Sequence, residues 1–279
     1  MTARGKLAGS LLLAKKYLAL FRVRFQNEMQ YRVAALAGVC TQFVWGFMEI
    51  LLFRAFYAGG GEMPMTFSQL VTYEWLQQAF LALFMLWFWD KDIIEAITGG
   101  NIAYELARPM DLYNMWFTRV AAQRMARALL RCLPVLLVAF LLPEPYRMSL
   151  PVSFGAFLLF VVSTALGLCV VAALTMLVYA LTFFTMSASG VRIFAASIAE
   201  LLSGAVVPLP FFPKKWRLLA ELSPFAAVQN LPLRLYSGNL AGDEALFYLG
   251  MQVFWLVALV LLGRILLRRM RRRLVVQGG

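Results

Sequence analysis

The chain has 279 residues, of which 62% are hydrophobic and only 14% are charged. So few charged side chains cannot cover a water-soluble globule of this size, so the composition excludes a soluble enzyme or binding domain and indicates a membrane protein. The formal net charge of +12 would suggest nucleic acid as a partner of a soluble protein. Here the Lys and Arg residues gather toward the two ends of the chain, as in the cytoplasmic flanks of membrane proteins, and we expect no nucleic-acid partner.

Six apolar stretches are long enough to cross a bilayer as helices, which takes roughly 20 apolar residues. They are residues 33–57, 67–89, 120–142, 152–184, 191–208 and 245–267. We therefore expect an all-α membrane protein that forms one domain over residues 1–279, with six transmembrane helices. Seven Lys or Arg residues precede the first stretch and six lie in residues 264–273, so the positive-inside rule places both termini in the cytoplasm. An even number of spans agrees with that placement.

Residues 1–32 are expected to form an amphipathic helix on the inner membrane surface, ahead of the first span. Apolar residues recur there at steps of three and four, which puts them on one side of a helix: Leu11, Ala14, Leu18, Phe21, Phe25 and Met29. Lys16, Arg24 and Asn27 fall on the opposite side. A cytosolic helix that packs on a partner is the alternative.

Two glutamates fall inside the first two predicted spans, where an ionisable residue is a functional candidate by default. Glu49 and Glu74 both lie toward the outer ends of their spans. The simpler interpretation is a carboxylate at the membrane interface, with Arg54 as a nearby candidate partner.

Residues 90–117 separate the second and third spans and are expected to form a cytoplasmic loop. Asp92 and Glu95 have the spacing of a capping box, with Asp in place of Ser or Thr, at the start of a helix over residues 93–98. The pair Gly99-Gly100 can end that helix with a left-handed turn.

A second short helix is predicted over residues 102–107. It stops at Arg108, because a residue that precedes proline, here Pro109, is disfavoured in helical geometry. Two short helices between spans suit docking onto a soluble partner, and an interfacial loop without a partner is the alternative.

Four arginines mark the start of the third span: Arg119, Arg124, Arg127 and Arg131. The last three are spaced by three and four and share one side of a helix. An arginine at the bilayer centre costs about 2.5 to 3.5 kcal/mol. We therefore expect the true span to begin after Val120 or its helix to extend well into the cytoplasm. These side chains are expected to contact lipid phosphates, with a role toward a substrate as the alternative.

The segment after the fifth span cannot be another simple span, because it combines several prolines with a basic cluster. Proline removes a backbone donor, and unpaired backbone groups are costly in hydrocarbon, so residues 209–244 are expected to dip into the membrane from outside and leave again. Glu200 lies about halfway along the fifth span, just before Ser203-Gly204, and is expected to face a polar path or a partner. Hydrogen bonding to a neighbouring polar side chain is the alternative, and the candidate acceptors and donors are Thr175, Thr182 and Ser197.

The closing third of the chain resembles the permease subunits of ABC type-2 exporters. The ordered elements that carry the resemblance are Ser203-Gly204, Pro208, Phe212-Pro213, Trp216, Pro224-Phe225, Pro232 and Gly238. The six-span layout, the amphipathic first helix and the internal helices between the second and third spans also match that family, so the resemblance covers nearly the whole chain.

The resemblance implies a membrane subunit that works with two copies of an ABC ATPase and with a second permease chain, identical or homologous. It places residues 90–117 as the coupling loop that contacts the ATPase, through Asp92, Glu95, Gly99, Gly100, Glu105, Arg108, Pro109 and Asp111. It places Glu200, Ser203 and Gly204 along the transport path. The external re-entrant hairpin would be shaped by Pro208, Pro213, Trp216, Pro224, Phe225 and Pro232.

The implied location is the bacterial cytoplasmic (inner) membrane, with membrane lipids around the spans and the basic tail 268–279 inside. The sequence has no G-x-x-x-x-G-K-[ST] motif, so ATP and Mg are expected in the partner ATPase and no cofactor in this chain. The apolar spans favour an apolar or amphipathic substrate, such as a drug, a lipid or a peptide.

Two rival functions are open at this point. An ion-coupled secondary transporter would use Glu49, Glu74 and Glu200, but such folds usually show matching broken helices in two halves, and the proline-rich break occurs once. An intramembrane enzyme lacks support, because the chain has no histidine and no clustered acidic pair at the membrane face. The cysteines lie in apolar stretches and are expected to pack as small buried residues rather than to form a disulfide: Cys40, Cys132 and Cys169.

Overall fold

The structure is a computed structural model that describes residues 3–185 and 187–273. The described residues form helices joined by short connections, and none of them forms a strand. The α-helices are α1 (Ala3–Glu28), α2 (Arg32–Ala58), α3 (Phe67–Phe84), α4 (Lys91–Thr98), α5 (Ile102–Leu106), α6 (Leu112–Leu141), α7 (Phe154–Thr185), α8 (Ala188–Ser203), α9 (Lys214–Glu221), α10 (Asn230–Ser237) and α11 (Gly242–Arg273). A single 3-10 turn, η1 (Leu209–Phe211), lies between α8 and α9.

Three helices, α2, α7 and α11, are long and apolar enough to cross a membrane, over Arg32–Ala58, Phe154–Thr185 and Gly242–Arg272. They coincide with the first, fourth and sixth predicted spans. The other predicted spans are occupied by helices that are shorter or more polar, because α3 has 18 residues, α8 has 16, and α6 carries four arginines. The fold is therefore an all-helical multi-pass one, and the count of six spans stays a prediction.

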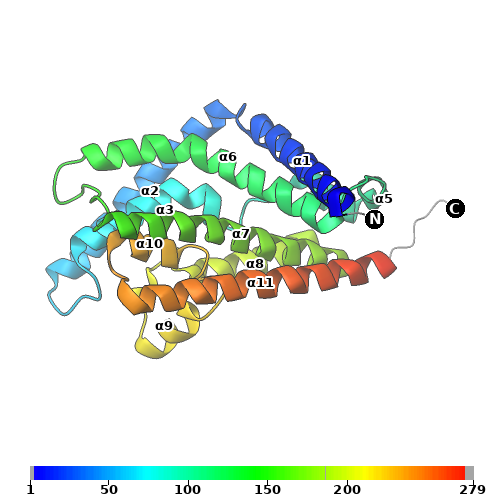
Figure 1. The fold of residues 1–279 in the computed structure, drawn as a ribbon. Coiled ribbons are helices and arrows are strands. Elements are labelled where there is room, and N and C mark those ends of the chain that lie inside the picture. Colours follow the sequence, from blue (N-terminus) through cyan, green and yellow to red (C-terminus); the bar gives the residue numbers. More distant parts are fainter. Residues whose placement is uncertain (1–2, 186, 274–279) are drawn as a thin grey trace.

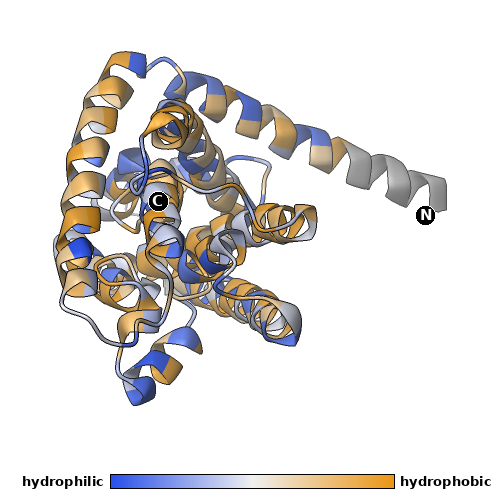
Figure 2. Cartoon of the chain, turned by 90° about the vertical axis from the view of Figure 1, so that its left-hand side faces the viewer, coloured by the Kyte–Doolittle hydropathy of each residue, from blue (hydrophilic) through white to orange (hydrophobic). Residues whose placement is uncertain are grey.

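The two ends of the helix bundle differ. The beginning of α1, the end of α11 and the short helix α5 lie at one end of the molecule, whereas the α2–α3 and α6–α7 connections lie at the other (Figure 1). Figure 2 shows hydrophobic residues along the bundle helices, while hydrophilic and hydrophobic residues alternate along α1. Large apolar side chains point outward on the candidate spans, including Trp45 on α2, Leu158 on α7 and Phe254 on α11. Such a surface is suited to lipid and not to water.

The helix α3 forms the centre of the bundle and packs against α2, α6, α7 and α10. Leu70, Trp75 and Leu76 are fully buried on it, and the Trp75 indole donates to the Tyr146 carbonyl at 2.9 Å. The loop before α10 approaches α7 closely at Gly167, where a Cβ would lie 2.5 Å from the Val228 carbonyl oxygen. Only glycine fits there.

α3 ends at Phe84, five residues before the predicted end of the second span at Trp89. The reason lies in another helix, because the Arg124 guanidinium on α6 donates to the carbonyls of Leu83 at 3.1 Å, Met85 at 2.7 Å and Phe88 at 3.3 Å. The carbonyls at the end of a helix need donors, and a cation also matches the helix dipole there. Arg124 thus allows the chain to leave the helix early.

α1 confirms a helix over Ala3–Glu28, but the predicted polar side is wrong in part. Arg24, expected on the polar side, instead lies partly buried against the loop after α3 and pairs with Asp92 at 3.2 Å. The face that packs on α6 contains Leu20 and Phe21, and Glu28 at its end pairs with Arg127 at 2.8 Å. Ion pairs with the bundle therefore decide the orientation of α1. The Leu11 side chain and residues 274–279 of the predicted tail lie outside the described residues.

The predicted break after the fifth span is present. Gly204 ends α8 in the left-handed region at φ +79°, and the chain then passes through η1, α9 and α10 before α11. Such a φ suits glycine and costs other residues about 1 kcal/mol or more. The cysteines are all free, but only Cys132 is fully buried as expected, because Cys40 is exposed on α2 and Cys169 is half-buried.

Candidate functional site

The candidate site is the segment from Asp90 to Asp111, called the elbow below, which contains α4 and α5. α4 begins with Asp90 as its N-cap, because the Asp90 carboxylate accepts from the backbone N–H groups of Asp92 at 3.1 Å and Ile93 at 3.4 Å. The predicted cap at Asp92 is therefore wrong by two residues. Beneath α4, three isoleucines are buried in one apolar cluster with residues of α6 and α7: Ile93, Ile94 and Ile97.

The turn between α4 and α5 follows the prediction. Gly99 donates to the Glu95 carbonyl at 2.8 Å, and Gly100 takes the left-handed φ of +76° that glycine tolerates. α5 runs from Ile102 to Leu106, and Ile102 anchors it in the same apolar cluster as α4. Two short helices are thus fixed on the bundle by isoleucines.

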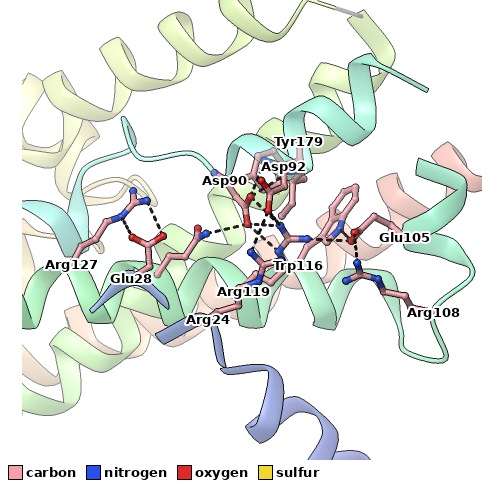
Figure 3. A network of polar contacts seen from close by, with 12 residues as sticks. Arg24, Glu28, Asp90, Asp92, Glu105, Arg108, Trp116, Arg119, Arg127 and Tyr179 are labelled. Carbon is pink, nitrogen blue, oxygen red and sulfur yellow. Dashed lines mark hydrogen bonds and ion pairs between the residues drawn. The ribbon is translucent and has the colours of Figure 1, made fainter. Parts of the chain in front are cut away.

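One buried guanidinium joins the elbow to α6 (Figure 3). Arg119 is 1% exposed, and it donates through Nε and Nη2 to both Asp90 carboxylate oxygens, each at 3.0 Å. It also reaches Asp92 at 3.1 Å and Glu105 at 3.3 Å. We call these four residues the Arg119 cluster. A two-pronged Arg–carboxylate contact fixes both partners in distance and angle.

Aromatic side chains complete the cluster. The Trp116 indole donates to Glu105 at 3.1 Å, and the Tyr179 hydroxyl accepts from the Asp90 backbone N–H at 2.9 Å. Arg108 pairs with the same Glu105 carboxylate at 3.3 Å from the exposed side. The elbow is therefore positioned by α6 and α7 together, and Glu105 acts as internal support because its side chain is buried.

The predicted contact of the four arginines with lipid phosphates is wrong for Arg119 and Arg124. Their side chains are buried and donate hydrogen bonds to protein groups instead. Arg127 binds both carboxylate oxygens of Glu28, at 2.8 and 3.1 Å. Arg131 lies over the Phe88 ring, 5.9 Å from its centroid, and its Nε has no hydrogen-bond partner among the described residues. Burial of a guanidinium is tolerated where carboxylates or carbonyls replace its water.

The outward side of the elbow is polar with one large aromatic side chain. Glu95, Gly99, Gly100, Arg108 and Pro109 are exposed there, as the sequence predicts. Tyr104, which the sequence analysis did not single out, is 75% exposed between them. Exposed tyrosine is a common anchor in protein interfaces.

Asp111 has a different role. Its side chain caps α6 by accepting from the Asn114 N–H at 3.0 Å and pairs with Arg271 of α11 at 3.4 Å. Its backbone N–H donates to the Tyr17 hydroxyl of α1 at 3.2 Å. Asp111 therefore joins the end of the elbow to three helices.

Of the residues predicted along a path, Glu200 and Ser203 lie on α8, which packs on α7 and α9, and Gly204 ends that helix. Glu200 accepts a hydrogen bond from the Trp87 indole, so it bonds to a neighbouring polar side chain as in the alternative, but the partner is none of Thr175, Thr182 and Ser197. Thr175 and Thr182 instead donate to carbonyls of their own helix. Ser203 is buried, and the Gly204 carbonyl accepts from the Tyr73 hydroxyl at 3.3 Å.

Glu49 and Glu74 are not separate interfacial residues. Their carboxyl groups are hydrogen-bonded to each other, Glu49 also accepts from Gln78 at 2.9 Å, and Glu74 is 1% exposed. The suggested partner Arg54 binds the Tyr146 hydroxyl instead.

The region of the predicted hairpin is organised around a second buried ion pair. Glu221 binds Arg234 at 2.6 Å and Arg217 at 2.9 Å, and it accepts from the Tyr248 hydroxyl at 2.8 Å. We call these four residues the Glu221 cluster. The prolines and aromatics predicted for this region shape the connections around it: Pro208 precedes η1, Pro213 precedes α9, Trp216 is exposed on α9, Pro224 and Phe225 follow α9, and Pro232 is buried in α10.

The comparison with known proteins identifies the family. The sequence model of the ABC-2 family transporter proteins matches residues 43–278, which is most of the chain. The chain belongs to this family. A comparison with curated proteins finds no match.

Membership makes this chain the membrane subunit of an ABC transporter and implies an ABC ATPase subunit as its partner. It does not favour the ion-coupled alternative. Within residues 3–185 and 187–273 of this ABC-2 protein, no group of three His, Cys, Asp or Glu side chains could hold a metal ion.

Proposed function

We propose that this chain is the permease subunit of an ATP-driven exporter that moves an apolar or amphipathic substrate, such as a drug, a lipid or a peptide, across the cytoplasmic membrane of a bacterium. The observation that carries the proposal is the elbow. It offers an exposed surface with Glu95, Tyr104 and Arg108, on a base of buried isoleucines. A rigid surface at one end of the bundle, on the same side as the start of α1 and the end of α11, suits contact with a soluble motor (Figure 1).

The family supports our proposal for the rest of the assembly. Because the sequence has no P-loop motif, we propose that ATP and Mg bind to the partner ATPase and that this chain carries out no catalysis of its own. We propose two ATPase copies and a second permease chain, identical or homologous, with both termini of this chain in the cytoplasm. The region of the Glu221 cluster would then form the external re-entrant hairpin.

Within the bundle, we propose that Glu200, Ser203 and Gly204 border the transport path. Glu200 is half-buried on α8, and its partner Trp87 lies in the loop that leads into the elbow. A displacement of the elbow would therefore act directly on the residue that holds Glu200. This link gives the docking surface a route to the path.

The docking surface is tested by purifying the affinity-tagged full chain from its native membrane and identifying bound subunits by mass spectrometry. We expect an ABC ATPase to co-purify and to hydrolyse ATP. The triple variant Glu95→Ala, Tyr104→Ala, Arg108→Ala should lose it, because truncating one interface anchor alone typically costs about 2 kcal/mol or more.

The matched control is Lys215→Ala, an exposed cation of α9 at the other end of the molecule. It should retain the ATPase fully. If the triple variant still binds the ATPase, the elbow is not the docking surface. Transport by the purified chain alone, driven by a proton gradient, would overturn the proposed function as a whole.

A further inference from the structure

A cavity of about 700 Å³ lies beside the elbow, between α1, α2, α6, α8 and the loop after α3. Its wall includes Arg24 and Glu28 of α1, Arg127 and Arg131 of α6, and Arg192 of α8. The indoles of Trp87 and Trp89 and the ring of Phe88 form part of the same wall. None of these groups is used by the docking surface proposed above.

The carboxylates of this cavity are already neutralised. Asp90 and Asp92 belong to the Arg119 cluster, and Asp92 pairs with Arg24 as well. Glu28 is held by both nitrogens of the Arg127 fork. The acidic groups of the wall therefore offer no free charge to the remaining cations.

Three cations of the wall have no carboxylate partner among the described residues: Lys91, Arg131 and Arg192. Arg192 donates through Nε to the Ala188 carbonyl, which orients it without neutralising it. Arg131 has a buried Nε with no partner. The cavity thus has an excess of positive charge, presented by two guanidinium forks that match phosphate oxygens.

An apolar surface leads away from the cavity along α2. Ala34 lines the cavity, and Gly38, Thr41 and Trp45 follow at helical steps of four, three and four on the same side of the helix. Thr41 and Trp45 line a separate groove of about 200 Å³ with Cys40 and Val44. From Ala34 to Trp45 the helix rises about 16 Å, the length of much of one acyl chain.

We propose that this cavity binds the phosphate headgroup of an anionic phospholipid, whose acyl chains lie against α2. The cations hold the phosphate, the aromatic wall lies at the level of the headgroups, and Gly38 leaves room for the Arg131 guanidinium against α2. The occupant comes from the leaflet on the elbow side. This binding does not depend on the direction or the substrate of transport.

The proposal is tested by titrating the delipidated full chain in detergent with dioleoylphosphatidylglycerol and measuring the Kd of the first bound lipid by native mass spectrometry. Each cation near an anionic headgroup contributes a factor of roughly five to the affinity. The double variant Arg131→Gln, Arg192→Gln should therefore raise the Kd about 30-fold. Arg192→Gln alone should raise the Kd about fivefold. This single variant keeps the test valid if the double variant does not fold.

A variant that keeps every charge tests whether the lipid needs a guanidinium at a fixed position or is attracted only by the net positive charge. In Gly38→Ala the new Cβ would lie 2.7 Å from Arg131 Cζ, so the flexible end of Arg131 must move. We expect its Kd to rise about fivefold, as if the contribution of one cation were lost. Lys215→Gln, which removes an exposed cation far from the cavity, should leave the Kd unchanged.

Competition distinguishes the sources of phosphate. Dioleoylphosphatidylcholine should bind clearly more weakly, and millimolar inorganic phosphate should not displace the anionic lipid. Equal affinity for the two lipids, displacement by phosphate alone, or an unchanged Kd in both the Arg192→Gln and Gly38→Ala variants would each overturn the proposal.

Discussion

The Arg119 cluster and the Glu221 cluster lie toward opposite ends of the bundle and are built in opposite ways. At the elbow, one guanidinium is surrounded by three carboxylates. In the α9–α11 region, one carboxylate accepts from two guanidinium groups and a phenol. Both clusters are buried at their centres, since the side chains of Arg119 and Asp90 are 1% and 2% exposed and those of Arg234 and Glu221 are 3% and 5% exposed.

The clusters differ in how they reach the surface. Asp92 of the Arg119 cluster is 65% exposed and pairs with Arg24 of α1, and Glu105 pairs with the exposed Arg108. The Glu221 cluster closes on itself, and its Arg217 side chain is only 31% exposed. The comparison suggests that the elbow can respond to what binds it, whereas the other end holds a fixed shape.

The largest expected effect concerns the sides of the membrane on which the two regions lie. In a background with Cys40, Cys132 and Cys169 replaced, we expect Lys214→Cys on α9 to react with an impermeant thiol reagent added to intact cells. Thr98→Cys on α4 should react only after the cells are opened. Both positions are exposed, whereas Ser237 of α10 is buried and would give no information. Labelling in the reverse order would invert the proposed topology.

Removing the centre of the Arg119 cluster should destabilise the protein most. Arg119→Met leaves Asp90 and Glu105 buried without their partner, which costs about 3 to 5 kcal/mol. We expect a clear fall in the thermal unfolding midpoint of the full chain in detergent. Arg147→Met, which removes an exposed pair with Glu144, is the control and should cost less than about 1 kcal/mol. Equal midpoints for the two variants would contradict the central role of Arg119.

A substitution in the Glu221 cluster should lower the stability somewhat less than one in the Arg119 cluster. Glu221→Gln keeps an oxygen that accepts from Arg234, while Asn239 continues to accept from the same guanidinium at 2.7 Å. We expect a loss of about 2 to 3 kcal/mol, the value of hydrogen bonds to charged groups. The measurement is the same unfolding midpoint. Because this cluster closes on itself, ATPase binding at the elbow should be unchanged, and loss of the ATPase would show that the two ends are coupled.

The smallest effect is expected where the elbow meets α1. Arg24→Gln removes a partly exposed ion pair with Asp92 and should lower stability by less than about 1 kcal/mol. Its effect should fade at high salt, because exposed charges are screened. The measurement is the difference in unfolding midpoint between low and high salt. A difference that persists at high salt would show that Arg24 contributes by packing rather than by charge.

Local signals in the sequence predicted much of the elbow. The positions of α4 and α5, the turn at Gly100 and the stop before Pro109 follow from glycine and proline chemistry within a few residues. The break after α8 follows in the same way from Gly204 and the prolines beyond it. These features depend on neighbours in the chain, so a single sequence is enough.

The parts that sequence reasoning missed depend on distant segments. Arg119 and Arg124 were expected to meet lipid, because nothing near them in the chain shows that Asp90 or the carbonyls at the end of α3 lie within reach. The Asp90 cap had a local signal, since an Asp stands directly before the predicted helix, but Asp92 offered the same residue type. Tyr104 offered no local signal, because exposure of one aromatic residue depends on how the whole elbow packs.

The hydrogen bonds of Arg124 have a mechanical consequence for any working cycle. One side chain of α6 holds carbonyls on both sides of the point where α3 stops, and it also contacts Thr175 of α7. The C-terminal end of α3 therefore cannot gain or lose a turn without breaking these bonds. For the same reason, a displacement of α6 must carry α3 with it. The helices α3, α6 and α7 then shift as one body.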